Sequence, residues 1–328
     1  MRRHALVTGA TGGLGRTLVP QLLAAGYRVT ATGRNAQVGE DLAINGARFM
    51  GADLIADSLE SLVDQVDTVF HLAALSSPWG RYADFEAINI TATGRLLEAA
   101  RQAGAKRFIY VSTPSIYAAA HDRLGLTETD PPAMPFANAY AATKYAAERR
   151  VLAANDTGIA TIVLRPRAIV GPHDEVLLPR LLRAVKNGRI RLPGGGDALI
   201  ELTDVRDVCA ALIAADRASA TGKAFNISGG SPRSLRALLT TIFAVLERPV
   251  DMRSIGVGRA MAFARLAEMI TKLIPGQPEP AITTYTVKAL GYSQTFDLSA
   301  ARTNLGWTPR YTPEEAIAHA LGEGAIHD

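Results

Sequence analysis

Short runs of apolar residues, rich in Val, Ile and Phe, alternate with longer segments of helical periodicity through the first half of the chain. Short, continuously apolar runs are typical of strands that are buried on both faces of a parallel sheet. The pattern predicts strands at residues 5–8, 28–32, 47–51, 68–72, 107–112, 161–165 and 224–228. It predicts the main helices at residues 13–25, 57–65, 84–103, 138–155 and 205–216.

This alternation of strand and helix indicates an α/β protein, with a Rossmann-type doubly wound parallel sheet and a smaller C-terminal substrate-binding lobe. The pattern becomes less regular after Gly171, where Gly and Pro interrupt the apolar segments. We therefore expect residues 1–172 to form the dinucleotide-binding domain, to which residues 203–230 return. Residues 173–202 and 231–328 are expected to form the lobe.

The composition adds that the protein is an ordinary globular one. Of its 328 residues, 48% are hydrophobic, and the formal net charge is +4 with basic and acidic residues interspersed. This distribution argues against nucleic-acid binding. No uncharged run approaches the roughly 20 residues that cross a bilayer, so we expect no membrane insertion. The single cysteine, Cys209, excludes a framework of disulfides and favours a reducing, cytoplasmic location.

A glycine-rich segment, TGATGGLG at residues 8–15, follows the first predicted strand and opens the first predicted helix. In this context Gly9 permits a tight turn, Gly12 lets the backbone approach a pyrophosphate, and Gly15 lets helix and strand pack closely. The helix N-terminus supplies free amide groups and a positive dipole. The segment therefore predicts a dinucleotide-binding turn.

The end of the second predicted strand indicates which dinucleotide is bound. NAD-specific sites usually place an acid there, which accepts hydrogen bonds from the adenosine ribose. Here Arg34 occupies that region and no acid follows before Glu40, so a 2′-phosphate can pair with the guanidinium. We predict NADP(H) rather than NAD(H). The alternative is that Arg34 is a solvated loop residue.

Further cofactor contacts are expected after the third and fourth strands. Asp53 is placed to meet the adenine edge, unless it only caps a helix. The small residues Ala73 and Ala74 allow the backbone to lie against the cofactor, although close packing alone would also explain them. The full set of expected cofactor-binding residues is Gly9, Thr11, Gly12, Gly13, Leu14, Gly15, Arg34, Asp53, Leu54, Ala73, Ala74, Tyr140, Lys144 and Pro166.

A tyrosine and a lysine four residues apart, Tyr140 and Lys144, share one face of a predicted helix. A free phenol has a pKa near 10, so a phenol that acts as a base near neutral pH needs a lower pKa. We expect the ammonium group and a positively charged nicotinamide ring to provide that lowering. Thr113 follows the strand at residues 107–112, at the sheet edge where ligands of open α/β folds bind.

Other motifs accompany these residues: Asp53, HLAA at residues 71–74, Asn89, VSTPSIY at residues 111–117, LRP at residues 164–166 and Gly171-Pro172. Together they resemble the extended short-chain dehydrogenase/reductases of the NAD-dependent epimerase/dehydratase group, over nearly the whole chain. The resemblance implies that Tyr140 is the acid/base and that Lys144 activates it.

The same resemblance assigns two supporting roles and an assembly. It implies that Thr113 donates a hydrogen bond to the substrate oxygen, and that Asn89 shapes the region of the proton relay. Counting four residues back from Tyr117 selects Thr113 rather than its neighbour as this hydroxyl. It also implies a homodimer, formed through the helices that contain Leu96 and Tyr145.

The substrate is indicated by a departure from the family pattern. Sugar-nucleotide members have an asparagine that contacts the substrate's phosphates where this chain has Ala168, which cannot hydrogen-bond a diphosphate. Residues 259–270 carry Met and Phe, which suits a core helix or a lid over an apolar substrate, and residues 75–82 add an aromatic loop. These features resemble the branch of 3β-hydroxysteroid dehydrogenases and 2-alkyl-3-oxoalkanoate reductases. Arg167 would there meet the acid group, unless it is simply an exposed arginine.

We therefore predict an NADP-dependent oxidoreductase that transfers a hydride between nicotinamide and a carbonyl or secondary alcohol of an apolar small molecule, a β-keto acid or steroid-like compound. An NDP-sugar epimerase or dehydratase with an internal redox cycle is the main alternative. A non-catalytic NADP(H)-sensing protein is the third interpretation. Neither His121 nor His173 belongs to a set with metal-ligand spacing, so we expect no metal site.

Overall fold

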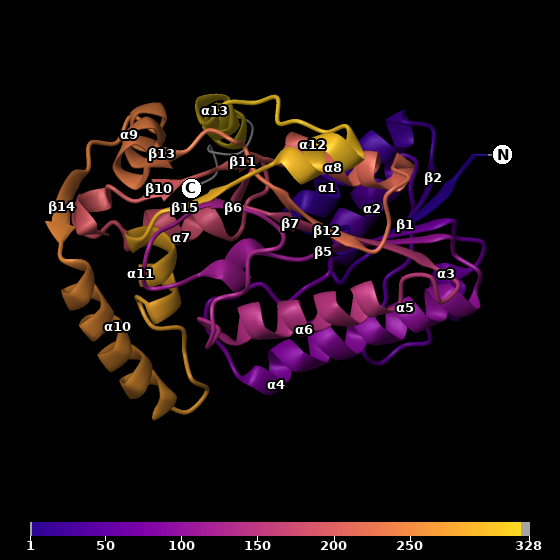
Figure 1. The fold of residues 1–328 in the computed structure, drawn as a ribbon, viewed down its shortest axis with the longest axis horizontal. Helices are drawn as coiled ribbons and strands as arrows, with labels where there is room; N and C mark the ends of the chain where they lie inside the picture. The colour runs from indigo at the N-terminus through magenta and orange to yellow at the C-terminus, as the bar shows by residue number, and fades with distance from the viewer. Residues whose placement is uncertain (1, 323–328) are drawn as a thin grey trace.

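The computed structural model describes residues 2–322. Its centre is a seven-stranded parallel sheet in the order β12-β7-β5-β4-β1-β2-β3 (Figure 1). Because the strand order runs outwards in both directions from β1 and β4, the fold is the predicted Rossmann-type doubly wound sheet. The strands are β1 (His4–Thr8), β2 (Arg28–Thr32), β3 (Arg48–Phe49), β4 (Thr68–His71), β5 (Arg107–Val111), β7 (Ala160–Pro166) and β12 (Lys223–Ile227).

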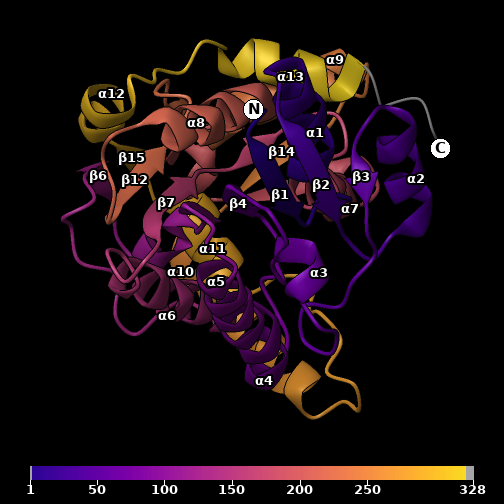
Figure 2. The same cartoon turned by 90° about the vertical axis from the view of Figure 1, so that its right-hand side faces the viewer.

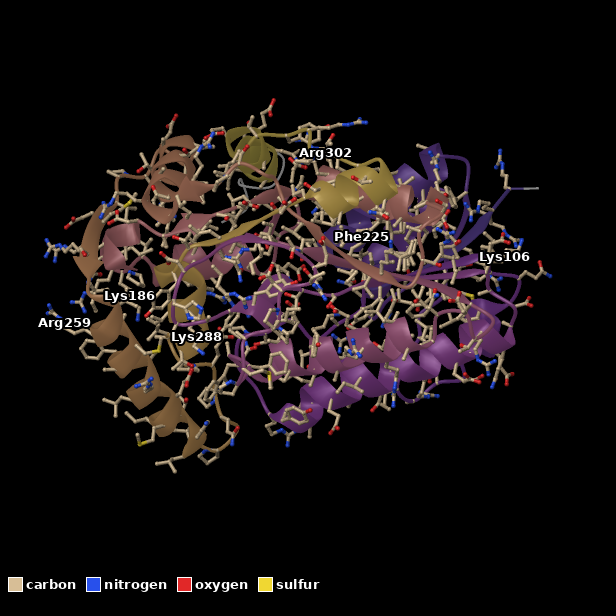
Figure 3. The ribbon with its side chains drawn as sticks, in the orientation of Figure 1. Lys106, Lys186, Phe225, Arg259, Lys288 and Arg302 are labelled. Atoms are coloured by element: carbon tan, nitrogen blue, oxygen red, sulfur yellow. The ribbon has the colours of Figure 1, made fainter. Side chains whose placement is uncertain are left out.

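Helices cover both faces of this sheet (Figures 1 and 2). One face carries α1 (Gly13–Ala24), α8 (Val205–Arg217) and α12 (Ser299–Leu305), and the other carries α3 (Glu60–Val63), α5 (Ala92–Gln102) and α6 (Ala139–Ala153). Alternate residues of a strand enter opposite layers: in β1, Val7 joins the core under α1 and α8, whereas Leu6 joins the core under α5 and α6. Phe225 of β12 is 1% exposed and lies between the sheet and the first of these layers (Figure 3).

The lobe lies to the left in Figure 1. It contains a four-stranded sheet in the order β13 (Arg233–Ser234), β10 (Leu199–Ile200), β15 (Gln294–Phe296) and β6 (Arg123–Leu126), and a parallel pair of β9 (Arg189–Pro193) with β14 (Asp251–Ile255). Its helices are α7 (Leu177–Ala184), α9 (Leu235–Val245), α10 (Val257–Lys272), α11 (Thr284–Gly291) and α13 (Pro313–Gly322). A short parallel pair, β8 (Ile169–Val170) with β11 (Thr203–Asp204), joins it to the main sheet.

The chain crosses between the two parts more often than a single division suggests. β6 comes from the segment predicted to be dinucleotide-binding, yet it pairs with β15. In the other direction, Trp307 lies in the segment predicted to be the lobe, and its indole nitrogen donates to the Asp207 carbonyl at the start of α8. The domain boundaries at residues 172, 203 and 230 therefore remain a prediction, because segments from each side of them pack on the other part of the chain.

Three local predictions need correction. The helix α2 (Ala36–Ile44) was not predicted, although Asn35 caps it by accepting a hydrogen bond from the Val38 amide at 3.2 Å. The segment at 57–65 forms only the short α3. The segment at 84–103 is not one regular helix, because a π-helix at Glu86–Thr91 separates α4 (Tyr82–Phe85) from α5.

The interpretation of residues 259–270 as a core helix is wrong for most of their large apolar side chains. In α10, Ala260, Met261 and Ala264 are buried, whereas Phe263 is 57% and Met269 is 61% exposed. The helix therefore packs on the lobe by a narrow face of small side chains and leaves its larger ones outside. Within residues 2–322 no helix, α10 included, is both long and apolar enough to cross a membrane.

A buried ion pair connects α6 to β7. The Arg165 guanidinium donates to both carboxylate oxygens of Glu148, with 3.1 Å between Nε and Oε2 and a shorter contact between Nη2 and Oε1. Arg165 Nη1 also donates to the Tyr117 hydroxyl. Glu148 is fully buried and Arg165 nearly so, so the two charges compensate each other away from water.

Replacing Glu148 by Gln tests this pair. The variant leaves the buried guanidinium without its counter-charge, a change that costs about 3 kcal/mol or more of folding free energy. We expect the thermal unfolding midpoint, followed by circular dichroism, to fall by several degrees. Glu98→Gln is the matched control, because its ion pair with Arg101 is exposed on α5 and should leave the midpoint unchanged. Equal midpoints for Glu148→Gln and the wild type would contradict the assignment.

Candidate active site

The turn between β1 and α1 needs its glycines for different reasons. Gly9 has φ +67°, and a Cβ there would lie 2.8 Å from the Ala73 amide nitrogen. A Cβ at Gly15 would lie 2.5 Å from the Cα of Ala10. At Gly12, by contrast, a Cβ would come no closer to a described atom than 3.5 Å, from the Gly9 carbonyl oxygen. The chain's own packing therefore does not require a glycine at position 12.

Gly12 is the N-cap of α1, and among residues 2–322 no side chain caps the amides at that helix end. The first turn of α1 carries no acidic residue. Free amides, the positive end of the helix dipole and open space at Gly12 suit an anionic diphosphate. The residues present thus fit the phosphates of a nicotinamide dinucleotide. Thr11, Gly13 and Leu14 lie in the same turn, as expected for the predicted set.

The predicted adenosine side of the site lies beside this turn. A Cβ on Gly33 would come within 2.4 Å of the Thr11 hydroxyl oxygen, which brings the end of β2 against the glycine turn. Arg34 follows directly and is exposed. Asp53 is also exposed, but its Oδ1 accepts a hydrogen bond from the Ile55 amide at 2.7 Å, so that oxygen serves a local turn. Leu54 is half-buried next to it.

Asn89 holds the loop after β4 against α6. Its Oδ1 accepts a hydrogen bond from the Leu75 amide at 2.9 Å, and its Nδ2 donates to the Thr143 hydroxyl at 3.1 Å. The side chain is fully buried in the π-helix. The loop that it fixes includes Ala73 and Ala74, both half-buried. Since both ends of the amide are engaged, the geometry makes Asn89 a positioning residue.

A chain of hydroxyl groups runs from the end of β5 into the lobe. Thr113 Oγ1 donates to Ser115 Oγ at 2.9 Å and accepts a hydrogen bond from the Ser115 amide at 3.1 Å. Ser115 Oγ in turn lies 2.7 Å from the Tyr285 hydroxyl of α11. Thr113 is buried. Through Ser115, the hydroxyl predicted from the sequence is connected to α11 of the lobe.

The Tyr140 phenol interacts with two members of this row of hydroxyl groups, Thr113 and Tyr285. Burial and, to a smaller extent, nearby Tyr285 raise the pKa of its phenol to about 12, although hydrogen bonding to Thr113 and Ser76 opposes the rise. The expected direction, a lowered pKa from the Lys144 ammonium, is therefore not produced by the chain's own groups. Desolvation outweighs the neighbouring dipoles, and the phenol is neutral near pH 7.

The contacts and burial of Lys144 explain why its ammonium group does not lower the pKa of Tyr140. Its Nζ donates to the Val111 carbonyl oxygen at 2.6 Å and lies 4.0 Å from the centroid of the Tyr110 ring. The side chain is 1% exposed, and burial lowers the pKa of the ammonium to about 7 while Glu148 opposes that shift. Lys144 is thus attached to the end of β5, one helical turn from Tyr140 on the face of α6 that enters the protein.

Sequence reasoning did not single out Ser115, Ser76 or Tyr285 as site residues. Ser115 and Ser76 lay inside motifs that were quoted for other residues, so their proximity to Thr113 and Tyr140 gave a weak signal. Tyr285 is 170 residues from Ser115 in the chain, and its meeting with Ser115 depends on how the lobe packs. No local pattern could have predicted that contact.

Comparison with known proteins identifies the family. A family model described as the NAD dependent epimerase/dehydratase family matches residues 5–228. A 2-alkyl-3-oxoalkanoate reductase of Stenotrophomonas maltophilia is 35% identical over 98% of this chain and 99% of that protein. The 4-hydroxy-2-methyl-3-oxo-4-farnesyl-3,4-dihydroquinoline-1-oxide ketoreductase of Stigmatella aurantiaca is 33% identical over 98% of both chains.

The structure of MoeE5 in complex with UDP-glucuronic acid and NAD superposes with a TM-score of 0.76, at 27% identity and over 98% of both chains. The match thus extends through the lobe as well as the sheet. The resemblance that the motifs indicated is confirmed: this chain belongs to the NAD dependent epimerase/dehydratase family.

Proposed function

We propose that the protein is an NADP(H)-dependent oxidoreductase that interconverts a carbonyl and a secondary alcohol in an apolar small molecule, a β-keto acid or steroid-like compound. The observation that supports this proposal is that Thr113 hydrogen-bonds to Tyr140, and Lys144 to Val111, at the end of β5 in the same parallel sheet whose strand β1 leads into the glycine turn. When bound, the dinucleotide supplies the hydride for reduction and accepts it for oxidation. The chain itself has to hold the substrate oxygen and move one proton.

The neutral phenol supports reduction as the favoured direction. A carbonyl that gains a hydride at carbon needs a proton at oxygen, and a buried phenol with a pKa of about 12 carries that proton throughout the neutral range. Thr113 and Ser115 supply hydroxyl groups that can hydrogen-bond the same oxygen. The proton thus leaves the Tyr140 oxygen as the new O–H bond forms.

Lys144 has two tasks in this scheme. Its ammonium, fixed on the Val111 carbonyl, is placed to hold ribose hydroxyls of the cofactor. Its charge also stabilises the phenolate that remains once Tyr140 has given up its proton. Burial lowers the pKa of Lys144 to about 7 although Glu148 opposes this shift, so only part of the molecules carry this charge near pH 7.

Two observations favour an apolar substrate over a nucleotide sugar. Ala168 stands where sugar-nucleotide members have a phosphate-binding asparagine, and the similar proteins of Stenotrophomonas and Stigmatella are reductases by name. The second candidate, an epimerase or dehydratase with an internal redox cycle, is favoured by the match to MoeE5 with UDP-glucuronic acid and NAD. We also propose a homodimer through the outer surfaces of α5 and α6, which lie side by side (Figure 1).

NADPH oxidation, followed by absorbance, tests the function on a panel of 3-oxo acids, ketosteroids and nucleotide sugars. We expect oxidation with the apolar ketones only. Conversion of a nucleotide sugar without net change in NADPH would replace the proposal by the epimerase. Tight NADPH binding with no conversion of any compound would favour the sensing protein.

Tyr140→Phe tests the proton donor within the same assay. Loss of a general acid typically costs about 10²- to 10⁴-fold in rate, so we expect turnover to fall by this amount. NADPH affinity, measured by fluorescence titration, should change little because the ring is kept. Tyr145→Phe, on the same helix, is the matched control. Undiminished turnover in Tyr140→Phe would refute its role.

Arg34→Ala tests the choice between NADP(H) and NAD(H). The KM for NADPH should rise at least about tenfold, since a charge-assisted pair with the 2′-phosphate is lost. The KM for NADH should stay the same. Arg48→Ala, also exposed but on β3, controls for the loss of one positive charge. A wild-type protein that prefers NADH would refute the assignment.

The buried Lys144 makes stability depend on pH. Because its folded-state pKa is about 7 against an ordinary value of 10.5, the unfolded chain binds one more proton between these values. Stability from this group therefore rises with pH across that window, by at most about 1.4 kcal/mol per pH unit. Urea unfolding at pH 7 and pH 9 should show a smaller rise for Lys144→Met than for the wild type. Lys106→Met, at an exposed position (Figure 3), should show the wild-type rise.

A further inference from the structure

Arg167 is a buried cation with no partner. The residue is 8% exposed, and its Nε has no hydrogen-bond partner although the atom is inaccessible to solvent. Within residues 2–322 its side chain forms no ion pair or hydrogen bond. Burial accordingly lowers the pKa of the guanidinium. A desolvated guanidinium is costly for the fold, so a protein that keeps one needs a compensating group.

The backbone holds this side chain firmly in place. The Arg167 amide donates to the Ile227 carbonyl at 2.8 Å, and the Thr203 hydroxyl donates to the Arg167 carbonyl. Pro166 precedes it as the last residue of β7. Ala168 follows with φ +38°, a left-handed conformation that is unfavourable for alanine. Strained backbone of this kind persists where surrounding contacts fix it, and it is concentrated at ligand sites.

Two groups, Tyr285 and Glu201, act on the charge of Arg167, and Tyr285 also contacts the candidate active site. Both groups favour the charged form of the guanidinium. Tyr285 also acts on Tyr140 and hydrogen-bonds to Ser115. Arg167 directly follows β7, which pairs in parallel with β5 up to Leu164, and Thr113 follows β5, so both residues lie at the same edge of the sheet.

Glu201 does not neutralise Arg167 by direct contact. Its Oε2 accepts a hydrogen bond from the Ser228 hydroxyl, and its Oε1 accepts one from the Phe296 amide at 3.2 Å. No ion pair between Glu201 and Arg167 falls within 4 Å in the described part of the chain. Within residues 2–322, no protein group therefore accepts a hydrogen bond from Nε of the guanidinium.

We propose that Arg167 binds a carboxylate of the substrate, and so selects acids among the carbonyl compounds that the site can take. This inference rests on the proposed oxidoreductase function and specifies its substrate class as 3-oxo acids. In a 3-oxo acid, one carbon separates the carboxylate from the reacting carbonyl, so the proposal places both groups at the edge of the sheet where β5 and β7 end. A guanidinium matches the two carboxylate oxygens by parallel hydrogen bonds. The name of the similar Stenotrophomonas protein, a 2-alkyl-3-oxoalkanoate reductase, agrees with this class.

A binding experiment tests the carboxylate site without turnover. A 2-alkylalkanoic acid and its methyl ester, both without the 3-oxygen, are titrated calorimetrically into the wild type and Arg167→Met. The acid should bind the variant about 10- to 150-fold more weakly, the range for charge-assisted hydrogen bonds. The ester should bind both proteins equally. Arg259→Met, at the outer end of α10 (Figure 3), should bind the acid like the wild type. Equal acid affinity in the wild type and Arg167→Met would overturn the proposal.

Kinetics separate this inference from the function on which it rests. The substrates are a 2-alkyl-3-hydroxy acid and its methyl ester, oxidised with NADP⁺. Arg167→Met should lose kcat/KM for the acid by the same 10- to 150-fold and keep it for the ester. Equal losses for acid and ester would refute selection of the carboxylate. If neither compound is oxidised by the wild type, the proposed function fails, and the calorimetric comparison still decides whether Arg167 binds acids.

The thermal midpoint distinguishes a ligand-binding arginine from a structural one. If Arg167 serves only as the distant counter-charge of Glu201, Arg167→Met leaves that carboxylate uncompensated and lowers the midpoint. If Arg167 is kept for a ligand, replacing an unpartnered buried charge by an apolar side chain raises the midpoint or leaves it unchanged. A lower midpoint together with unchanged acid binding would assign Arg167 to the fold alone.

Discussion

Helix α6 carries a stripe of polar side chains into the protein, at intervals of four residues: Tyr140, Lys144 and Glu148. Lys144 and Glu148 are 1% and 0% exposed, which few charged residues are. Each is compensated by an element of the sheet, Glu148 by Arg165 of β7 and Lys144 by the carbonyl of Val111 at the end of β5. The register of α6 on the sheet is therefore fixed by electrostatics as well as by packing. Because the same stripe holds the phenol, the candidate site inherits that register.

Burial then determines the protonation of the site more than neighbouring charges do. It keeps the Tyr140 phenol neutral and lowers the pKa of Lys144 to about 7. It also lowers the pKa of His71 to about 3, so this imidazole is neutral between Thr8 and Thr93.

The sequence was sufficient for features that depend on local pattern. Period and composition predicted all seven strands of the main sheet, because a parallel sheet buried on both faces leaves continuous apolar runs. The glycine turn was also predicted correctly as a turn, because each glycine there lies either in a close backbone contact or at an open position. The helix α2 was missed although the cap at Asn35 was present as a signal.

Features that depend on tertiary packing were beyond the sequence. The sign of the Tyr140 pKa shift follows from its burial, which the spacing of Tyr140 and Lys144 cannot reveal. The contact of Tyr285 with Ser115 joins segments that only the folded lobe brings together. Likewise the exposure of Phe263 and Met269 reflects what α10 packs against, whereas their spacing alone is compatible with a core helix. Arg167 was considered from sequence, but only its burial shows that its charge lacks a partner.

The glycine at position 13 has a role that differs from those of its neighbours. A Cβ there would lie 2.5 Å from the carbonyl oxygen of His173, in the segment that leads from β8 into α7. The glycine turn therefore packs directly against the backbone of the segment that leads into α7. A methyl group at position 13 would clash with the His173 carbonyl and push the two segments apart. The absence of a Cβ at Gly13 thus allows the backbone that leads into the lobe to pack directly on a residue of the glycine turn.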